Sequence, residues 1–502
     1  MASKPVTINH QLIKKNTIEH REYQINLAEQ AKRENCLIVL PTGLGKTVVA
    51  LHIIAEYLSK DTGGVLFLAP TRILVNQHYE FLKNNLLIDD ITLITGEDLI
   101  TKRKKLWMNS VICATPEITK NDFQRKLVSP KQFNLVIFDE AHRTIGNYAY
   151  STIAGYLDID TRIIGLTATL PSEKIKAEEI LKTLKISSIA QRTDESSDVK
   201  PYLQDTKTQW ISVELPPKMK EIQHLLQRAL DARYQELKRK GVNVSQNKSL
   251  SQLLKMRDYV FHQNKWSIKP LFTAIRIHYA LSIFESHGIS SFLRFCERAR
   301  KKRGVGIREL FEVDPNFTKA LELAKVAQSL GIEHSKIAKL KEILRSVDGK
   351  AIVFTSYRDS VEIIYQKLLD MGIEACFLIG KAGETGLKQK KQIETVQKFR
   401  DGTYKVLIAT RVGEEGLDIS EVNLVVFYDN VPSSIRYIQR RGRTGRKKQG
   451  KLVVLITKDT IDETYYWISK RKINAAKNMG DKMSKALQNQ QKGTKTNLDA
   501  YF

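Results

Sequence analysis

Two separate parts of the chain show the same alternation of short apolar runs with longer polar segments, and this alternation restricts the possible folds most. The first series of runs is 36–40, 65–69, 111–114, 135–138 and 163–166. The second series is 351–355, 375–378, 406–409, 424–427 and 452–456. Strands separated by segments of helical length predict βαβ units and a parallel, doubly wound sheet. The sequence therefore predicts two α/β domains.

Between the two series the pattern changes to apolar residues at helical spacing, beginning after Pro216 and Pro217. This change predicts a helical domain inserted between the two α/β domains. The expected division is 1–215 for the first α/β domain, 216–336 for the insertion, 337–470 for the second α/β domain and 471–502 for a basic C-terminal tail.

The charge of the chain favours a polyanionic partner. Lys and Arg number 81 against 55 Asp and Glu, which leaves a formal net charge of +26 in 502 residues. Basic side chains that neutralise phosphates release counterions and so drive binding to nucleic acid. A solubility device is the alternative, although solubility requires a much smaller imbalance. The N-terminus has no apolar leader, and we find no run long enough to cross a bilayer, so we expect no membrane partner.

The segment LPTGLGKT, residues 40–47, directly follows an apolar strand. Such a loop presents backbone N–H groups to phosphates, and the helix after it adds its positive N-terminus. Lys46 would reach the β- and γ-phosphates, and the Thr47 hydroxyl would hold Mg²⁺. Leu40 stands where the strict pattern has glycine, but the strand–loop–helix context supports the assignment. We expect ATP and Mg²⁺ at the loop residues Thr42, Gly43, Leu44, Gly45, Lys46 and Thr47; a simple glycine turn is the alternative.

The segment LVIFDEAH, residues 135–142, brings two carboxylates to the end of another apolar strand. Ligands bind at this end of open α/β sheets. Asp139 fits a role in holding Mg²⁺ through water, and Glu140 fits the residue that polarises the attacking water. Acidic strand ends are common, but their position downstream of a phosphate loop favours catalysis.

The second α/β domain contains QRRGRTGR, residues 439–446. Arg443 and Arg446 could stabilise charge on the γ-phosphate from the opposite domain, with Gln439 as a further member of the catalytic set. Hydrolysis would then require the two domains to close. A solvated basic face or a track for phosphates is the alternative for these arginines.

These motifs occur together with Gln24, APTRILVNQ (69–77), ATPE (114–117), TAT (167–169), IVFTSYRDS (352–360) and ATRVGEEGLD (409–418). In this order and at these intervals, the set resembles superfamily 2 helicases. The stretches 139–150 and 412–446 and the helical insertion resemble, more narrowly, the archaeal Hef and eukaryotic FANCM family. The resemblance implies two RecA-like domains with a thumb-like insertion, and ATP-dependent 3′-to-5′ unwinding or branch migration of forked and branched DNA.

The resemblance also implies roles for single residues, each of which could equally serve the fold alone. Gln24 would read the adenine, and Asp418 would contact the ribose. Thr167 and Thr169 would link the ATP state to the nucleic-acid face. Phosphates of the tracked strand would contact Arg72, Thr115, Thr355, Thr410 and Gly413. In the insertion, a second basic cluster would be either a clamp on DNA or a solvated helix end: Arg298, Arg300, Lys301, Lys302 and Arg303.

The last eight residues, KTNLDAYF, resemble a box that binds the sliding clamp PCNA. Leu498, Tyr501 and Phe502 would be the anchors of a short 3₁₀ turn. Lys495 replaces the usual Gln, and a frayed apolar end is the alternative. Many Hef proteins continue into an XPF-type nuclease domain with an ERKxxxD-like acidic site. We find no such pattern here, so we expect the chain to be either truncated or a relative without the nuclease. The clamp-binding end favours the second option, with a separate nuclease as a possible partner.

We therefore expect an ATP-dependent DNA helicase or translocase that acts in replication-fork repair and recombination, in the cytoplasm and at the nucleoid in a prokaryote. Two alternatives stay open: an RNA-directed translocase of the Dicer and RIG-I-like branch, and a non-catalytic scaffold that binds a sliding clamp. The scaffold is disfavoured because all the expected catalytic residues of the two domains are intact: Lys46, Asp139, Glu140, Arg443 and Arg446.

Overall fold

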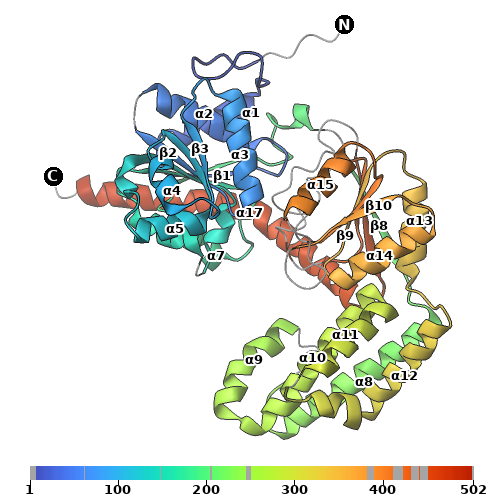
Figure 1. Cartoon of the computed structure of the whole chain (residues 1–502). Helices are drawn as coiled ribbons and strands as arrows, with labels where there is room; N and C mark the ends of the chain where they lie inside the picture. The colour runs from blue at the N-terminus through green and yellow to red at the C-terminus, as the bar shows by residue number, and fades with distance from the viewer. Residues whose placement is uncertain are drawn as a thin grey trace.

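The computed structural model of the chain describes residues 7–60, 63–146, 148–203, 206–244, 250–302, 304–380, 389–410, 422–430, 433, 440 and 450–499. Figure 1 shows two lobes that each contain a sheet flanked by helices, and a third lobe made of helices. The two α/β domains and the helical insertion expected from the sequence are therefore present.

The first sheet is parallel, with strand order β3-β4-β2-β5-β6-β1-β7. Its strands are β1 (Cys36–Val39), β2 (Gly64–Leu68), β3 (Ile91–Ile94), β4 (Val111–Ala114), β5 (Phe133–Phe138), β6 (Arg162–Thr167) and β7 (Ser188–Gln191). The helices around it are α1 (Glu22–Ala31), α2 (Lys46–Ser59), α3 (Arg72–Asn85), α4 (Ile100–Leu106), α5 (Pro116–Gln124), α6 (Ala149–Tyr156) and α7 (Lys174–Thr183).

Both faces of this sheet are buried, which explains why its strands are continuous apolar runs. Successive side chains of a strand point to opposite faces. In β1, Cys36 and Ile38 pack with residues of α1, α2 and α3. Leu37 and Val39 pack with residues of α5, α6 and α7 on the other face. The first domain thus has three layers, with the sheet in the middle.

The second sheet is also parallel, with strand order β10-β11-β9-β12-β13-β8. Its strands are β8 (Thr206–Val213), β9 (Ala351–Phe354), β10 (Ala375–Leu378), β11 (Val406–Ala409), β12 (Leu424–Phe427) and β13 (Gly450–Thr457). One face packs on α13 (Ser335–Arg345) and α14 (Arg358–Asp370). The other packs on α15 (Gln389–Arg400) and on the start of α17 (Ile461–Asp499).

The division of the chain differs at β8 from the one expected from the sequence. The range 1–215 was expected to form the first domain, but β8 pairs along its whole length with β13 at the edge of the second sheet. The reason is that a strand's sequence does not specify which sheet it joins. The chain therefore enters the second domain before it enters the insertion.

The insertion is a helical bundle with its own apolar core. It contains α8 (Pro217–Arg239), α9 (Leu250–Gln263), α10 (Ile268–His287), α11 (Ile289–Lys301) and α12 (Pro315–Ser329). Proline at the first position starts α8 and α12, and the Asp314 side chain caps α12 by accepting from the N–H groups of Asn316 and Phe317. These signals account for the starts of α8 and α12.

The helix α17 runs from the second α/β lobe to the first, as Figure 1 shows. Near its start Tyr466 packs in the core of the second sheet, whereas Met479 and Met483 pack in the core of the first domain. Gln191 at the end of β7 donates to the Lys477 carbonyl over 3.2 Å. The segment 471–502, expected to be a tail, is thus helical through Asp499 and covers the exposed edge of the first sheet.

A buried ion pair joins α13 to the start of α17. Lys336 Nζ donates to Asp462 Oδ2 and to the Tyr428 carbonyl, each over 2.7 Å, and both charged side chains are fully buried. Asp462 also accepts from the backbone N–H groups of Thr457 and Asn430. The pair therefore ties together four segments at one end of the second sheet.

A second contact connects this joint to the insertion. Glu285 at the end of α10 accepts from the N–H of Ile461, at 2.8 Å, and from Gln223 Nε2 of α8, at 2.7 Å. Burial raises the pKa of Glu285 to about 7, although both donors oppose the shift. The insertion is thus fixed to the second α/β domain through hydrogen bonds inside the joint.

The buried pair predicts a large loss of stability when one partner is removed. Lys336→Met leaves the Asp462 carboxylate buried without its cation, so we expect the free energy of unfolding to fall by about 3–5 kcal/mol in urea titrations. Lys339→Met on the same helix removes a solvent-exposed ion pair with Glu342. This substitution should change the free energy of unfolding by less than about 1 kcal/mol. Equal effects of the two substitutions would contradict this account of the joint.

Candidate nucleotide site and nucleic-acid contacts

The loop between β1 and α2 has the backbone conformation that a phosphate site requires. Gly43 and Gly45 have φ angles of 94° and 83°, which residues with a side chain rarely adopt. Gly45 caps α2, and Lys46 and Thr47 form its first turn. Lys46 Nζ donates to the Leu40 carbonyl over 3.3 Å, so its ammonium lies folded over the loop. The loop N–H groups and the N-terminus of α2 fit an anionic phosphate chain.

Gln24, which the resemblance assigns to the adenine, lies directly against this loop. Its Nε2 donates to the Leu44 carbonyl over 2.9 Å, and the hydroxyl of the neighbouring Tyr23 donates to the same carbonyl over 2.8 Å. A Cβ atom on Gly45 would lie 2.4 Å from Gln24 Nε2 and would displace that side chain, and the φ angle of 83° is itself strained for any residue but glycine. Tyr23 was missed from the sequence because a tyrosine in an amphipathic helix gives no signal of its own.

Asp139 and Glu140 follow β5 and lie at the same end of the sheet as the loop. Both Asp139 oxygens have partners: Oδ1 accepts from the Glu140 N–H at 2.9 Å, and Oδ2 lies 2.8 Å from His78 Nε2. Burial acts to raise the pKa of Asp139, but His78, the charge of Lys46 and the Glu140 N–H together hold it below its usual value. Asp139 is therefore ionised and oriented, as a ligand for Mg²⁺ would be.

Glu140 has a left-handed backbone conformation, with φ 51° and ψ 48°. This conformation costs about 1–3 kcal/mol for a residue with a side chain and is frequent at functional sites. The strained turn directly follows Asp139 at the carboxyl edge of the sheet, and it directs the Glu140 carboxylate toward His142.

The two predicted coupling residues lie next to the acidic pair. His142 Nδ1 is 3.3 Å from Glu140 Oε2 and 3.2 Å from Thr167 Oγ1. Thr167 Oγ1 in turn donates to the Thr169 carbonyl over 2.9 Å. A continuous polar chain therefore connects Glu140 to the end of β6. His142 was not singled out from the sequence, although it is the last residue of the DEAH segment.

The second-domain members of the predicted ATP site lie outside the described residues: Asp418, Gln439, Arg443 and Arg446. Arg440, which precedes two of them, is fully buried. Its guanidinium lies 5.4 Å from the centre of the Phe354 ring and 5.5 Å from that of Phe427, and it donates to the Asp429 carbonyl over 3.3 Å. One of the four arginines in 439–446 thus belongs to the core of the second domain.

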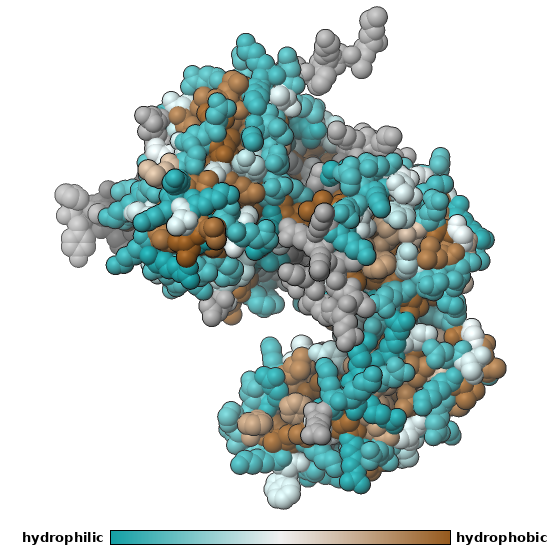
Figure 2. All heavy atoms as spheres, viewed as in Figure 1, coloured by the Kyte–Doolittle hydropathy of each residue, from teal (hydrophilic) through white to brown (hydrophobic). Residues whose placement is uncertain are grey.

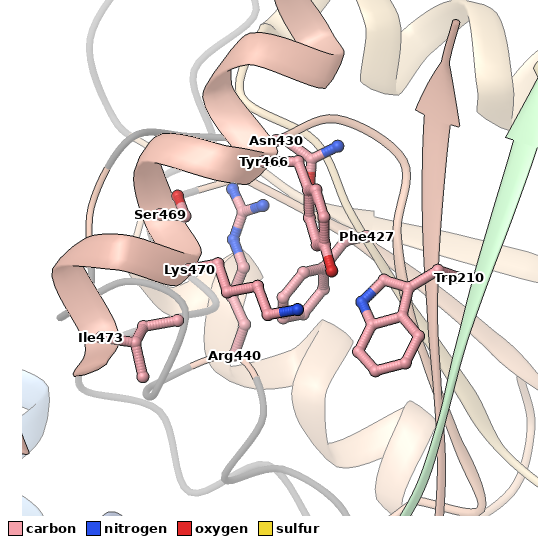
Figure 3. Close-up of a pocket in the computed structure, with 8 residues that line it drawn as sticks. All are labelled: Trp210, Phe427, Asn430, Arg440, Tyr466, Ser469, Lys470 and Ile473. Carbon is pink, nitrogen blue, oxygen red and sulfur yellow. The ribbon is translucent and has the colours of Figure 1, made fainter.

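A small cavity of about 40 Å³ lies beside Arg440, between α17 and the sheet. Figure 3 shows Arg440 near Phe427 and Tyr466, with Trp210 of β8 on the opposite side. Lys470 of α17 lies over the ring of Trp210 at 5.9 Å. The volume suffices for water but not for a nucleotide, so we assign this cavity to packing.

The residues expected to contact the phosphates of the tracked DNA strand differ in their exposure to solvent. Arg72 is the first residue of α3, is partly exposed and pairs with Glu97, and Thr115 caps α5. Thr355 and Thr410 follow the neighbouring strands β9 and β11, but both are buried. Thr355 has no accessible surface, so DNA could touch its hydroxyl only after the second domain rearranges. Gly413 lies outside the described residues.

The basic cluster of the insertion is divided between several roles. Arg298 forms a double contact with Asp359 of α14, and Arg300 lies over the Phe311 ring at 5.2 Å. Lys301 and Lys302 are exposed, and Arg303 lies outside the described residues. At least Arg298 therefore fixes the insertion to the second domain.

A more accessible surface lies on α9, which the sequence did not single out. The helix buries only Leu253 and Val260. Trp266 just after it is 85% exposed, and Phe261 and Tyr259 are 57% and 54% exposed, alongside exposed cations such as Lys255 and Arg257. Figure 2 shows hydrophobic residues among hydrophilic ones on the surface of this lower lobe. Aromatic rings with interspersed cations are suited to bases and phosphates.

The α9 surface also faces the first domain. The pKa of Glu173, next to α7, is lowered first by its contact with Lys176, and the charges of Lys472 and Lys255 add to the shift. In Figure 1, α9 lies on the side of the insertion that faces the first domain.

Of the three residues expected to anchor the PCNA-binding box, the structure describes only the backbone of Leu498. The backbone of Leu498 belongs to α17, which is α-helical there instead of forming the expected 3₁₀ turn, while Tyr501 and Phe502 lie outside the described residues. Of the helices that the structure describes, none combines the length and apolar content of a membrane span.

Two family models match the chain. The model described as "Type III restriction enzyme, res subunit" matches residues 11–172, and that described as "Helicase conserved C-terminal domain" matches 335–448. The matched ranges cover most of the two α/β domains and leave out the helical insertion.

Relatives and solved structures extend the similarity over about nine tenths of the chain, including the helical insertion. The crystal structure of the Pyrococcus furiosus Hef helicase domain is 36% identical, with a TM-score of 0.69, and the match covers 91% of this chain and 100% of that one. A Methanocaldococcus jannaschii protein that carries the name of an ATP-dependent RNA helicase is 38% identical over 91% of this chain. The Neurospora crassa ATP-dependent DNA helicase mph1 is 32% identical over 89%. The chain spans 60% and 41% of the length of these two relatives.

The contact between Gln24 and the loop predicts the effect of a methyl group on Gly45. Gly45→Ala adds backbone strain and a clash with Gln24, so we expect weaker binding of a fluorescent ADP analogue and a lower melting temperature. Gly241 has a similar φ angle of 79° but open space around it. Gly241→Ala should therefore lower the melting temperature without changing nucleotide affinity. Unchanged nucleotide affinity in Gly45→Ala would contradict the assigned role of the loop.

Proposed function

Because the chain belongs to the Hef and FANCM family of superfamily 2 helicases, we propose that it is an ATP-driven motor that moves 3′-to-5′ on DNA and remodels forked and branched substrates. The observation that most supports this proposal is the position of the phosphate loop, Asp139 and Glu140 at one edge of a RecA-like sheet, with a second such sheet in the same chain. The net charge of +26 supports a nucleic-acid partner.

In this proposal the first domain binds and activates Mg²⁺–ATP. The N–H groups of residues 42–47 hold the phosphates, Lys46 swings from the Leu40 carbonyl to the γ-phosphate, and Gln24 contacts the adenine. Thr47 and Asp139 would hold Mg²⁺, whose charge would neutralise that of the phosphates. Glu140 orients the attacking water, and His142 links it to Thr167.

The second domain completes the site when it closes. Gln439, Arg443 and Arg446 are proposed to face the γ-phosphate, and Asp418 the ribose. Because these residues come from the opposite domain, ATP binding favours closure and hydrolysis releases it. The DNA strand is proposed to lie across Arg72 and Thr115 of the first domain and the segment with Thr410 and Gly413 of the second. Thr355 would join these contacts after rearrangement.

We place the branched part of the DNA on α9 and on the exposed Lys301 and Lys302. In Figure 1, α9 lies on the side of the insertion that faces the first domain, where a duplex arm near a fork would lie. Binding of a sliding clamp by residues 495–502, and work with a separate nuclease, stay predictions from the sequence. Deleting 495–502 and finding unchanged binding to PCNA would remove the clamp proposal.

An RNA-directed translocase is the second candidate, because the Methanocaldococcus relative carries the name of an RNA helicase. The rate of ATP hydrolysis distinguishes the two when it is measured without nucleic acid and then with forked DNA, linear duplex DNA and duplex RNA. We expect the greatest stimulation by forked DNA. Greater stimulation by duplex RNA would favour the RNA-directed motor, and no hydrolysis with any of them would refute a motor.

Removing the ammonium of the loop tests whether hydrolysis depends on this site. Lys46→Ala should lower the hydrolysis rate at least about 100-fold, since the group acts on the charge that develops in the transition state, and it should leave the affinity for forked DNA nearly unchanged. Lys60→Ala, at the other end of α2, is the matched control and should behave as the wild type. Normal hydrolysis in Lys46→Ala would show that ATP is consumed elsewhere.

The α9 surface predicts a loss of DNA affinity that depends on salt. Lys255→Gln with Arg257→Gln should weaken forked-DNA binding and flatten its salt dependence, by about 0.9 in slope for each lost phosphate contact. The control is Lys319→Gln with Lys325→Gln, which removes two exposed charges from α12 of the same lobe. If both pairs lower the affinity and the slope equally, the surface of α9 has no special role.

A further inference from the structure

His78 is a buried residue of α3 whose ring contacts the acidic pair. The ring lies 4.4 Å from that of Phe67 in β2, centre to centre, and Nε2 lies 2.8 Å from Asp139 Oδ2. His78 is 7% exposed and Asp139 is 4% exposed. A polar contact between two such buried groups restricts the orientation of both, because neither can turn to water instead.

Among the residues that the structure describes, His78 is the only hydrogen-bond partner of the Asp139 carboxylate that comes from a distant part of the sequence. The other partner, the Glu140 N–H, is the next residue and moves with Asp139 itself. The orientation of Oδ2 therefore depends on where α3 holds the His78 ring. Groups that hold a metal-binding carboxylate in this way tune the affinity for the metal.

The first turn of the same helix contains two residues that connect α3 to the proposed DNA strand and to the second domain. Arg72, the first residue of α3, is partly exposed, and it is the residue proposed to contact the DNA strand. Ile73 packs against the apolar core of the second domain. His78 follows Arg72 by six residues, or about 9 Å along the helix axis. One helix thus carries the proposed DNA contact of Arg72, the contact of Ile73 with the second domain and the contact of His78 with Asp139.

We infer that His78 is a positioning residue that holds Asp139 in the orientation for Mg²⁺–nucleotide, and that this hold responds to DNA and to the second domain through the first turn of α3. The inference rests on the proposed function, because it takes Asp139 as the residue that holds Mg²⁺. The polar chain from Glu140 to Thr167 reaches the acidic pair from β6, whereas α3 reaches it from the opposite side. The two connections are therefore separable by substitution.

A purely structural role of His78 makes a different prediction. If His78 only fills the space beside Phe67, any side chain of similar size should replace it without effect on the metal. His78→Met and His78→Gln separate the two roles, because both side chains are flexible and nearly equal in length. Only Gln retains an N–H donor that can reach the Asp139 carboxylate.

The experiment measures the affinity for a fluorescent ADP analogue with and without Mg²⁺, in the absence of DNA. For the wild type we expect Mg²⁺ to strengthen binding. In His78→Met this gain should fall about 10-fold or more, with unchanged affinity in the absence of Mg²⁺, and His78→Gln should retain most of the gain. The control is His52→Met in α2. Within the described residues His52 forms no hydrogen bond with Asp139, so this variant should behave as the wild type.

The same variants then test whether DNA binding is coupled to the affinity for Mg²⁺–nucleotide. In His78→Met, forked DNA should raise the affinity for Mg²⁺–nucleotide less than in the wild type. Equal Mg²⁺ dependence in the wild type, Met and Gln proteins overturns the inference, and so does an equal loss in Met and Gln, which would indicate packing alone. If forked DNA fails to stimulate ATP hydrolysis by the wild type, the proposed function fails, whereas the DNA-free Mg²⁺ measurement still decides the role of His78.

Discussion

Parallel pairing of the strands determines where the chemistry of this protein lies. In the first sheet β1, β5 and β6 lie side by side and run in the same direction, so their carboxyl ends meet at one edge. The phosphate loop follows β1, the acidic pair follows β5, and Thr167 ends β6. Parallel sheets form only when helices cover both faces, and the helices that cover this sheet also supply α2 behind the loop and His78 beside Asp139.

The remaining parts of the chain connect this edge to the second domain and the insertion. The chain enters the second sheet at β8, leaves it for the insertion and returns at α13, and α17 finally runs back to the first domain. The joint between the insertion and the second domain is buried and polar, with Lys336, Asp462 and Glu285 at its centre. We therefore expect the insertion and the second sheet to move together, while α17 restricts how far the two sheets can separate.

The sequence predicts the elements of the core better than the long-range contacts. The strands at 111–114, 375–378, 406–409 and 424–427 have the predicted bounds, because buried parallel strands are uninterrupted apolar runs. The sheet that β8 joins and the path of α17 were not predictable, because partner choice depends on packing between distant segments. Gln24 and the loop lie together as expected from their motifs, whereas His78 and Tyr23 carry no motif. Arg298 was expected either to clamp DNA or to lie at a solvated helix end, but it pairs with Asp359 of the second domain. A basic cluster in a sequence does not reveal such a pairing with a distant segment.

The central claim is that two RecA-like domains close on one ATP while DNA is bound. A distance between labels on the two domains tests it most directly, for instance on cysteines introduced at the exposed Ile159 and Ile393. The four native cysteines are buried and should not react. The account predicts that the distance shortens when a non-hydrolysable ATP analogue and forked DNA are both present, and that it lengthens again with ADP. A distance that stays the same in all these states would contradict it.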